Sequence, residues 1–387
     1  MIPSTPPRRE AMADPKRVGI DARMVAQTPS GVGNYISSLL LPMCSTHPDT
    51  QFFLYSNSSI SFPEQPNVSV HEWGHKVGPL WMNTQVPKAV VRDRIDVFWG
   101  ANGVAPVLRF SPPTVVTVHD LVYRFAGETM LRGARWTKLV FQGWSVKRAS
   151  QVVAVSNATA EDIAAVYGRR ADAVIHPPVD RVFRRAGAEV LAAIRLKFDL
   201  PQRYWLSAGT LEPRKNLVQL LEAYLSTLQE GHDLPMLVLA GSAGWGGGRL
   251  NALIAAGVET NKIRKLGYVA IDDLAGLYGA CELLWMPSIY EGFGMPLLEA
   301  QHCGAAVVHG AHASMVEASA ALGVATGTDS AALRKTLRSL ARSEAPLACR
   351  LIDDDESGSA EAARRMWGCL CVASRDSPEP GGASKPA

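Results

Sequence analysis

The stretch "YWLSAGTLEPRKNLVQLLEAYLSTL", residues 204–228, contains one complete strand-and-helix unit. Its first six residues form an apolar run of strand length that ends at Gly209. Further along, apolar residues recur with helical spacing; they are Leu217, Leu220, Leu221, Tyr224, Leu225 and Leu228. The stretch therefore predicts a buried strand, a turn and an amphipathic helix.

The turn of this unit carries two adjacent cations, Arg214 and Lys215, at or just before the start of the helix. Positive charge at that end opposes the helix dipole, which favours negative charge there. An anion bound between the cations removes the conflict. A solvated pair on an exposed loop is the alternative, but the position just after a strand favours the anion.

The same alternation of strand and helix runs along most of the chain. Further apolar runs of strand length lie at 17–21, 52–55, 96–100, 114–120, 152–156, 173–178, 236–241, 263–269, 282–287 and 305–310. Ser156 is a suitable N-cap for a helix that ends at Gly168. Strands and helices in this order predict an α/β protein whose parallel sheets are covered on both faces.

The alternation of strands and helices is interrupted near residues 177–200, so we expect two doubly wound domains joined by a hinge at Pro177 and Pro178. The predicted segments are a disordered N-terminus (1–16), an N-terminal domain (17–185), a C-terminal domain (186–345) and a divergent C-terminal segment (346–387). Ligands of such folds bind beyond the carboxyl ends of the strands, so the expected site is an interdomain cleft.

Composition narrows the class of protein. The chain has 387 residues, 47% of them hydrophobic and 19% charged, as in a globular protein with two cores. A formal charge of +3 gives no case for nucleic-acid binding by the whole molecule. The six cysteines show neither zinc nor disulfide spacing, and no segment has the pattern of a signal peptide or a membrane span. We therefore expect a cytosolic protein that could still touch a membrane surface.

A glycine turn follows the first predicted strand, in "PSGVGNYISSLLLPM" (29–43). Gly31 and Gly33 lie where bare backbone amides and a helix dipole suit an anion. A turn that merely packs is the alternative, and without the third glycine of GxGxxG a dinucleotide-binding dehydrogenase is a poor interpretation.

The second informative stretch is "YEGFGMPLLEAQHCG" (290–304). Pro296 suits the first turn of a helix that stops at Gly304, so Glu299 lies about one turn inside it and Glu291 in the loop before it. Both carboxylates then face one strand-end region, together with the free N–H groups of Gly294 and Met295. Carboxylates accept paired hydrogen bonds from diols, so the pattern favours a nucleotide sugar over an unrelated solvated charge and capping charge.

These motifs together resemble a known family. "EGFGMPLLE" resembles the E-x7-E motif of the retaining glycosyltransferases of family 4, also called group 1, and "GTLEPRKN" resembles their phosphate-binding segment. "PSGVGNY", "VTVHD", "AVSNAT" and "HPPVD" appear in the family's order, so the resemblance covers roughly residues 17–318.

The resemblance implies a GT-B fold whose C-terminal domain holds the donor. Arg214 and Lys215 would bind the diphosphate, Glu299 the ribose and Glu291 the transferred hexose. The amide of Gly33 would approach the donor, and His119 would line the reaction centre.

The resemblance further implies a metal-independent, retaining hexosyltransferase that uses a nucleotide sugar, with GDP-mannose favoured. The acceptor would be a surface glycan or its polyprenyl-diphosphate-linked precursor. The acidic run "IDDDE" (352–356) is interpreted as a solvated loop rather than a metal-binding DxD motif. An inverting GT-B enzyme and a catalytically silent donor-binding or scaffold subunit are the alternatives.

The acceptor side gives a weaker signal. The helix predicted at 131–150 carries Arg132, Arg135, Lys138, Lys147 and Arg148 beside Trp136 and Trp144, and Trp81 is expected to be exposed near a turn. Such a face could rest on an anionic membrane or a polyprenyl-diphosphate, although ordinary core with a solvated face is the favoured interpretation.

The C-terminus departs from the family. Val316 and Glu317 stand where the family has a "PE" pair, and "EAARRMWGCLCVAS" (361–374) is the candidate for the family's closing helix.

Overall fold

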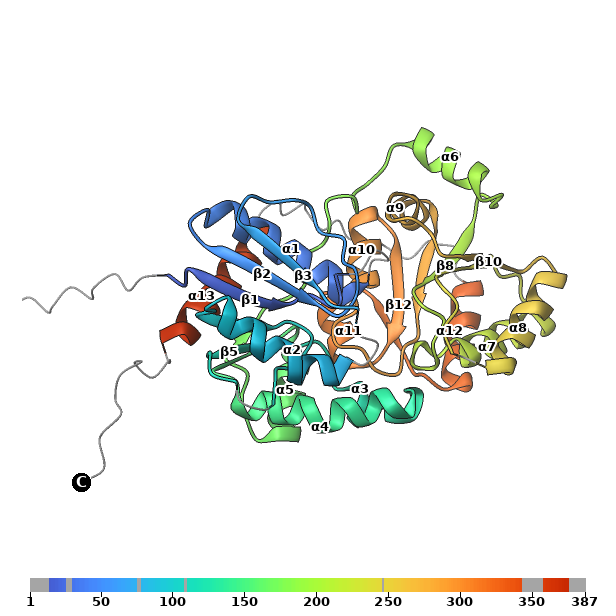
Figure 1. The fold of residues 1–387 in the computed structure, drawn as a ribbon. Helices are drawn as coiled ribbons and strands as arrows, with labels where there is room; N and C mark the ends of the chain where they lie inside the picture. Colours follow the sequence, from blue (N-terminus) through green and yellow to red (C-terminus); the bar gives the residue numbers. More distant parts are fainter. Residues whose placement is uncertain are drawn as a thin grey trace, which may run out of the picture. The chain divides into compact units, whose positions relative to one another are not determined.

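The structure is a computed structural model that describes residues 14–25, 30–74, 78–107, 110–245, 247–342 and 358–375. The described residues form two compact units. One draws on the ranges 1–117, 144–152 and 363–387, and the other on 118–143 and 153–362. Strands and helices alternate through both (Figure 1).

The first sheet has seven strands in the order β3-β2-β1-β4-β5-β6-β7. Their bounds are β1 Arg17–Asp21, β2 Gln51–Ser56, β3 Val68–Glu72, β4 Val97–Gly100, β5 Thr114–Val118, β6 Gln151–Ala154 and β7 Ala173–Val174. The central strands β4 and β5 are buried along their whole length, as expected of a parallel sheet covered on both faces. Strand β3 was not predicted, because its side chains are half-buried or exposed and form no apolar run.

Three described helices belong to the first unit: α1 (Gly31–Thr46), α2 (Gly78–Arg92) and α13 (Gly358–Arg375). Trp367 of α13 stacks on His47 with ring centroids 3.8 Å apart. The C-terminal stretch thus forms a helix, and Trp367 packs it on the first unit. The exposed position predicted for Trp81 is wrong: Trp81 is fully buried in α2, and the guanidinium of Arg23 lies over its ring.

The second sheet has six parallel strands in the order β10-β9-β8-β11-β12-β13. Their bounds are β8 Tyr204–Ala208, β9 Met236–Ala240, β10 Ile263–Gly267, β11 Leu283–Met286, β12 Ala306–Gly310 and β13 Val324–Thr326. The order reverses between β8 and β11, which is the switch point where doubly wound sheets bind ligands.

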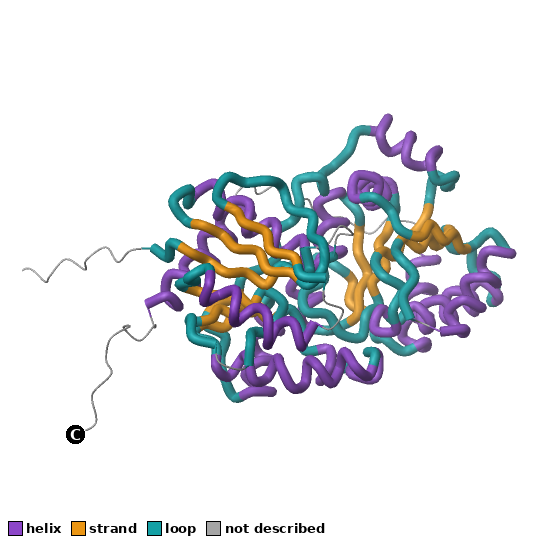
Figure 2. The backbone as a smooth tube through the Cα atoms, in the orientation of Figure 1, coloured by secondary structure: helices purple, strands orange, loops and turns teal. Residues whose placement is uncertain are grey.

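Helices cover both faces of this sheet (Figure 2). On one face, α7 (Leu217–Gln229), α8 (Gly247–Glu259) and α12 (Ser330–Arg342) share a core with the strands. The helices α6 (Ala188–Lys197), α9 (Ile271–Ala280) and α10 (Met295–Cys303) form the other group. Two sheets of this kind confirm the predicted α/β, doubly wound fold class.

The remaining elements of the second unit are short or peripheral. They are α3 Val122–Phe125, η1 Gly127–Thr129, α4 Arg132–Arg148, which runs into the first unit, α5 Asn157–Tyr167, η2 Pro213–Lys215 and α11 Ala313–Ala318. Helix α5 begins after Ser156, whose Oγ accepts a hydrogen bond from the amide of Thr159, and stops at the left-handed Gly168. Both ends match the sequence prediction.

Candidate functional site

The loops that follow β8 and β11 meet at the switch point of the six-stranded sheet. The loop after β8 contains η2, and the loop after β11 leads to Glu291. The amide of Ile289 donates a 2.9 Å hydrogen bond to the carbonyl of Arg214 and so joins the two loops directly. The predicted cations and the predicted carboxylate are therefore neighbours.

Glu291 lies between both cations. One carboxylate oxygen pairs with the guanidinium of Arg214, and the other lies 2.8 Å from Nζ of Lys215. Glu291 is only 7% exposed. Burial alone would raise the pKa of this carboxyl, but the charges of Arg214 and Lys215 hold it down at about 2. Glu291 therefore occupies the space between the two cations, and a bound anion at this place stays a prediction.

A second carboxylate, Glu212, completes this network and was missed by the sequence analysis. Its Oε1 lies 2.5 Å from Nη2 of Arg214. Burial raises the pKa of Glu212, while Arg214 and Lys215 partly offset that rise. Glu212 precedes Arg214 by two residues in the same turn, a spacing that could have marked it. Buried Glu291 and half-buried Glu212 thus neutralise the two cations.

Glu299 occupies the fifth position of α10 and is half-buried. The hydroxyl of Tyr278 donates a 3.1 Å hydrogen bond to its Oε2. Burial raises the pKa of Glu299 to about 7, although Tyr278 and the charge of Lys215 partly oppose the rise. Gly294 and Met295 stand at the beginning of α10, where the first helical amides have no partner within the helix.

His119 lies beside the loop that carries Glu291. A Cβ atom at Gly292 would stand 1.7 Å from the carbonyl oxygen of His119, so only glycine permits this approach of two backbones. The hydroxyls of Ser156 and Thr159 donate to the carbonyl of Gly292, at 2.6 and 3.0 Å. The structure therefore places the backbone of His119 beside Gly292, the residue after Glu291, and a role of its side chain in the reaction stays a prediction.

Tyr290 anchors the same loop, a role that the sequence analysis also missed. Its hydroxyl donates to Asp162 at 2.6 Å and accepts from the amide of Leu121 at 3.1 Å. Its ring stacks on Phe125, with centroids 5.6 Å apart. No motif signals these contacts, because their partners are more than a hundred residues away in the chain.

Gly31 and Gly33 belong to the first unit. The amide of Gly33 donates a 3.1 Å hydrogen bond to Oγ of Ser30, the N-cap of α1, and a Cβ there would stand 2.2 Å from the carbonyl oxygen of Met24. A close backbone approach thus already explains Gly33, whereas a Cβ at Gly31 would meet nothing within 4 Å. Their contact with a donor stays a prediction.

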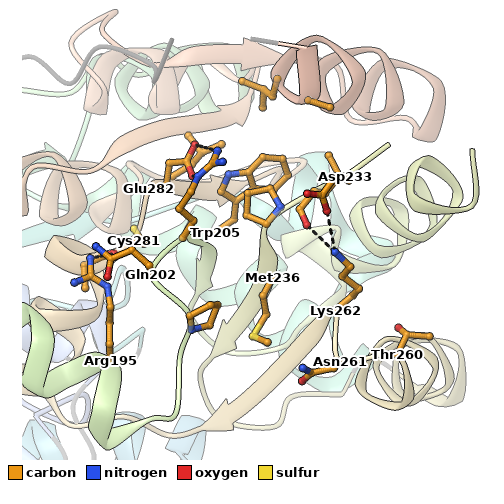
Figure 3. Close-up of a pocket in the computed structure, with 18 of the residues that line it drawn as sticks. Arg195, Gln202, Trp205, Asp233, Met236, Thr260, Asn261, Lys262, Cys281 and Glu282 are labelled. Atoms are coloured by element: carbon orange, nitrogen blue, oxygen red, sulfur yellow. Dashed lines mark hydrogen bonds and ion pairs between the residues drawn. The ribbon is translucent and has the colours of Figure 1, made fainter. Parts of the chain in front are cut away.

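A hollow of about 1050 Å³ lies at the opposite, amino-terminal edge of the six-stranded sheet (Figure 3). Trp205 lines it, together with the ion pairs Arg203–Glu282 and Lys262–Asp233. None of the site residues predicted from the sequence lines this hollow.

Comparison with known proteins places these features in a family. Residues 193–353 match the model for "Glycosyl transferases group 1", and residues 44–183 match that for "Glycosyltransferase Family 4". The two matches account for most of the chain.

Curated relatives include the O-antigen chain mannosyltransferase B of Escherichia coli, 37% identical over 42% of this chain and 44% of the relative. The serotype-specific mannosyltransferase WbdA of Escherichia coli is 30% identical over 50% of this chain and 25% of the relative. The chain spans less than half the length of these two relatives.

Solved structures share the fold. WaaG, described as a glycosyltransferase of lipopolysaccharide biosynthesis, superposes with a TM-score of 0.69 at 16% identity, over 93% of this chain and 97% of that one. The Anabaena protein HepE, solved with UDP and glucose, gives a TM-score of 0.62 at 18% identity, over 92% and 96%.

Proposed function

Because this chain belongs to the group 1 glycosyltransferases of glycosyltransferase family 4, we propose that it is a retaining hexosyltransferase that uses a nucleotide diphosphate sugar. The observation that carries the proposal is the buried Glu291 between Arg214 and Lys215 at the switch point. The proposed acceptor is a glycan or a lipid-linked glycan of surface polysaccharide synthesis. The names of the Escherichia coli mannosyltransferase relatives support mannose, and hence GDP-mannose, as the donor.

Charge determines the proposed mechanism. When the bond from the anomeric carbon to the diphosphate oxygen breaks, its electron pair remains on the diphosphate. Arg214 and Lys215 stabilise that charge, and these fixed cations allow transfer without a metal ion. Glu291 is then released from part of its ion pairing and accepts hydrogen bonds from hexose hydroxyls, while Glu299 accepts from the ribose diol. The acceptor hydroxyl attacks from the face that the diphosphate leaves and gives its proton to a diphosphate oxygen.

The test is a thermal-shift panel of nucleotide sugars, followed by product analysis. We expect GDP-mannose to stabilise the protein most, and the glycosidic product to keep the anomeric configuration of the donor. An inverted product would contradict the retaining mechanism. Tight donor binding with neither transfer nor hydrolysis would favour the silent scaffold subunit.

We also propose that the enzyme works at the cytoplasmic membrane surface through α3, η1 and the first half of α4. Trp136 of α4 is 69% exposed and therefore lies outside the core, whereas Trp144 is half-buried, as expected of core with a solvated face. Leu139 and Val140 share its helix face, and Leu131 and Phe125 are exposed nearby. The same segment carries four cations and the exposed acid Glu128; the cations are Arg124, Arg132, Arg135 and Lys138. Apolar anchors among cations fit an anionic bilayer surface.

Sedimentation with vesicles tests this surface independently of catalysis. We expect wild type to bind phosphatidylglycerol vesicles, and the double variant Trp136→Ser, Leu139→Ser to bind roughly tenfold less. Leu196→Ser is the matched control, because Leu196 is an exposed leucine of α6. Equal binding by wild type and the double variant would contradict the proposal, as would failure of wild type to bind.

None of the described helices is long and apolar enough to cross a membrane.

A further inference from the structure

Glu317, which the sequence analysis noted only as part of a family departure, joins three separate segments of the second unit. It lies near the end of α11, and its Oε1 accepts hydrogen bonds from the amide and the side-chain nitrogen of Asn157, at 2.9 and 2.8 Å. The same oxygen lies 2.7 Å from Nε2 of His176, and Oε2 accepts from the amide of Ala158 at 3.2 Å. One carboxylate therefore fastens α11 to the beginning of α5.

Both of these helices also hold residues 290–292, the catalytic loop. At the beginning of α5, Ser156 and Thr159 donate hydrogen bonds to the carbonyl of Gly292. At the beginning of α11, Oγ of Ser314 donates a 2.7 Å hydrogen bond to the carbonyl of Glu291. The loop is thus held by one helix on each side.

We propose that Glu317 is a positioning residue for glycosyl transfer: by tying α11 to α5 it closes a ring of contacts around the catalytic loop and fixes Glu291 against Arg214 and Lys215. The inference rests on the proposed function, since it assigns Glu317 a part in that reaction. It adds a residue that touches neither Arg214 nor Lys215 and acts only through the main chain of the loop.

Capping alone does not account for this arrangement. A helix N-terminus is ordinarily capped by a residue just before it, and Ser156 already does that for α5. Glu317 comes from a different helix, 160 residues further along the chain than Asn157. Its side chain is 18% exposed and satisfies two further amides of α5. Unlike an ordinary cap, Glu317 links two helices, and its hydrogen bonds oppose the separation of α5 and α11 on either side of the catalytic loop.

The experiment compares wild type with Glu317→Ala, Glu317→Asp and the control Glu161→Ala. Glu161 is an exposed carboxylate of α5 that takes no part in the ring. The first readout is amide hydrogen exchange of the peptide covering residues 288–294. We expect exchange to become roughly tenfold faster in Glu317→Ala, to be partly restored in Glu317→Asp and to stay unchanged in Glu161→Ala.

The second readout is the pH dependence of transfer. The charged and titratable groups that face Glu291 are Arg214, Lys215, Glu212 and His312. In Glu317→Ala the loop is misplaced, so we expect kcat to fall about 10- to 100-fold. Because the cations then stabilise the ionised Glu291 less, its pKa rises and the acidic limb of the pH profile of kcat moves to higher pH. The KM for the donor should change less than about threefold, because the cations themselves remain in place.

Wild-type exchange in residues 288–294 of Glu317→Ala would overturn the inference. So would a fall in kcat that merely follows a lower melting temperature, with exchange and the pH profile unchanged. Should the wild type transfer no sugar at all while Glu317→Ala still loosens the loop, the proposed function fails but the structural role of the ring stands.

Discussion

The two edges of the six-stranded sheet both carry cations paired with carboxylates, yet their surroundings differ. At the amino-terminal edge, the side chains of Arg203 and Glu282 are 72% and 27% exposed and border an open hollow (Figure 3). At the carboxyl edge, those of Lys215 and Glu291 are 12% and 9% exposed. The hollow therefore lies beside exposed pairs, and the buried charges lie at the switch point.

The difference in burial between the two sets of ion pairs indicates which edge is the better candidate for a functional site. An exposed pair is screened by water and stabilises the fold by little, whereas removing one member of a buried pair leaves a desolvated charge. The proposed partner of the buried cations Arg214 and Lys215 is the diphosphate.

The largest effect is expected when the buried carboxylate is neutralised. Glu291→Gln keeps the shape of the side chain but removes the charge that balances Arg214 and Lys215. We expect kcat to fall about 10²- to 10³-fold and the unliganded protein to lose about 2–3 kcal/mol of stability. Nucleotide affinity should not weaken, because both cations become available to the diphosphate.

Steady-state kinetics, isothermal titration with the nucleotide diphosphate and chemical denaturation check this prediction. Glu282→Gln at the other edge is the matched control, since it neutralises the carboxylate of an exposed pair. Comparable loss of activity in both variants would erase the distinction between the edges.

Lys215→Ala should have the next largest effect. Lys215 contributes a point charge to the diphosphate, while Arg214 continues to pair with Glu291. We expect nucleotide diphosphate affinity and turnover to fall together, by about 10- to 100-fold. Lys262→Ala is the control at the amino-terminal edge. A normal affinity in Lys215→Ala would remove the lysine from the phosphate site.

Much of the fold was readable from the sequence, because parallel strands buried on both faces leave continuous apolar runs. The runs at β8, β9 and β12 and the ends of α5 were predicted within a residue or so. The edge strands β3 and β13 were not, since their exposed positions break such runs.

The site was readable only in part. Sequence spacing placed Arg214, Lys215 and Glu291 just after strands of the second domain, and the structure shows that these two strands are neighbours. The sequence could not reveal that Glu291 itself occupies the space between the cations. Nor could it identify Tyr290 and Glu317 as anchors, because their partners come from distant segments that only the fold brings close.

Replacing Glu299 should have a smaller effect, which appears as a change in how stability depends on pH. Burial raises the pKa of Glu299 to about 7, so the carboxyl is protonated at pH 5 and ionised at pH 8 in the folded protein. Because the folded pKa exceeds the unfolded one, the stability that this group contributes is complete at low pH and is lost as pH rises through about 7. Glu299→Gln should therefore melt like wild type at pH 5 and a few degrees higher at pH 8.

Nucleotide binding should show the opposite trend. An ionised carboxylate accepts both hydroxyls of a ribose, so wild-type affinity should rise several-fold between pH 6 and 8, and Glu299→Gln should lack that rise. Titration calorimetry at four pH values measures it. A parallel rise in both proteins would assign the pH dependence to another group.

Arg203→Ala should have the smallest effect, and for that reason it sets the baseline of the comparison. Arg203 is largely exposed, and its two hydrogen bonds to Glu282 compete with water. We expect a change of less than about 1 kcal/mol in stability and no change in kcat or donor KM. Urea denaturation and steady-state kinetics measure both. If kcat fell more than threefold, a change at the amino-terminal edge would have to alter the carboxyl edge through β8. The burial of a charged group would then no longer suffice to tell a catalytic edge from a structural one.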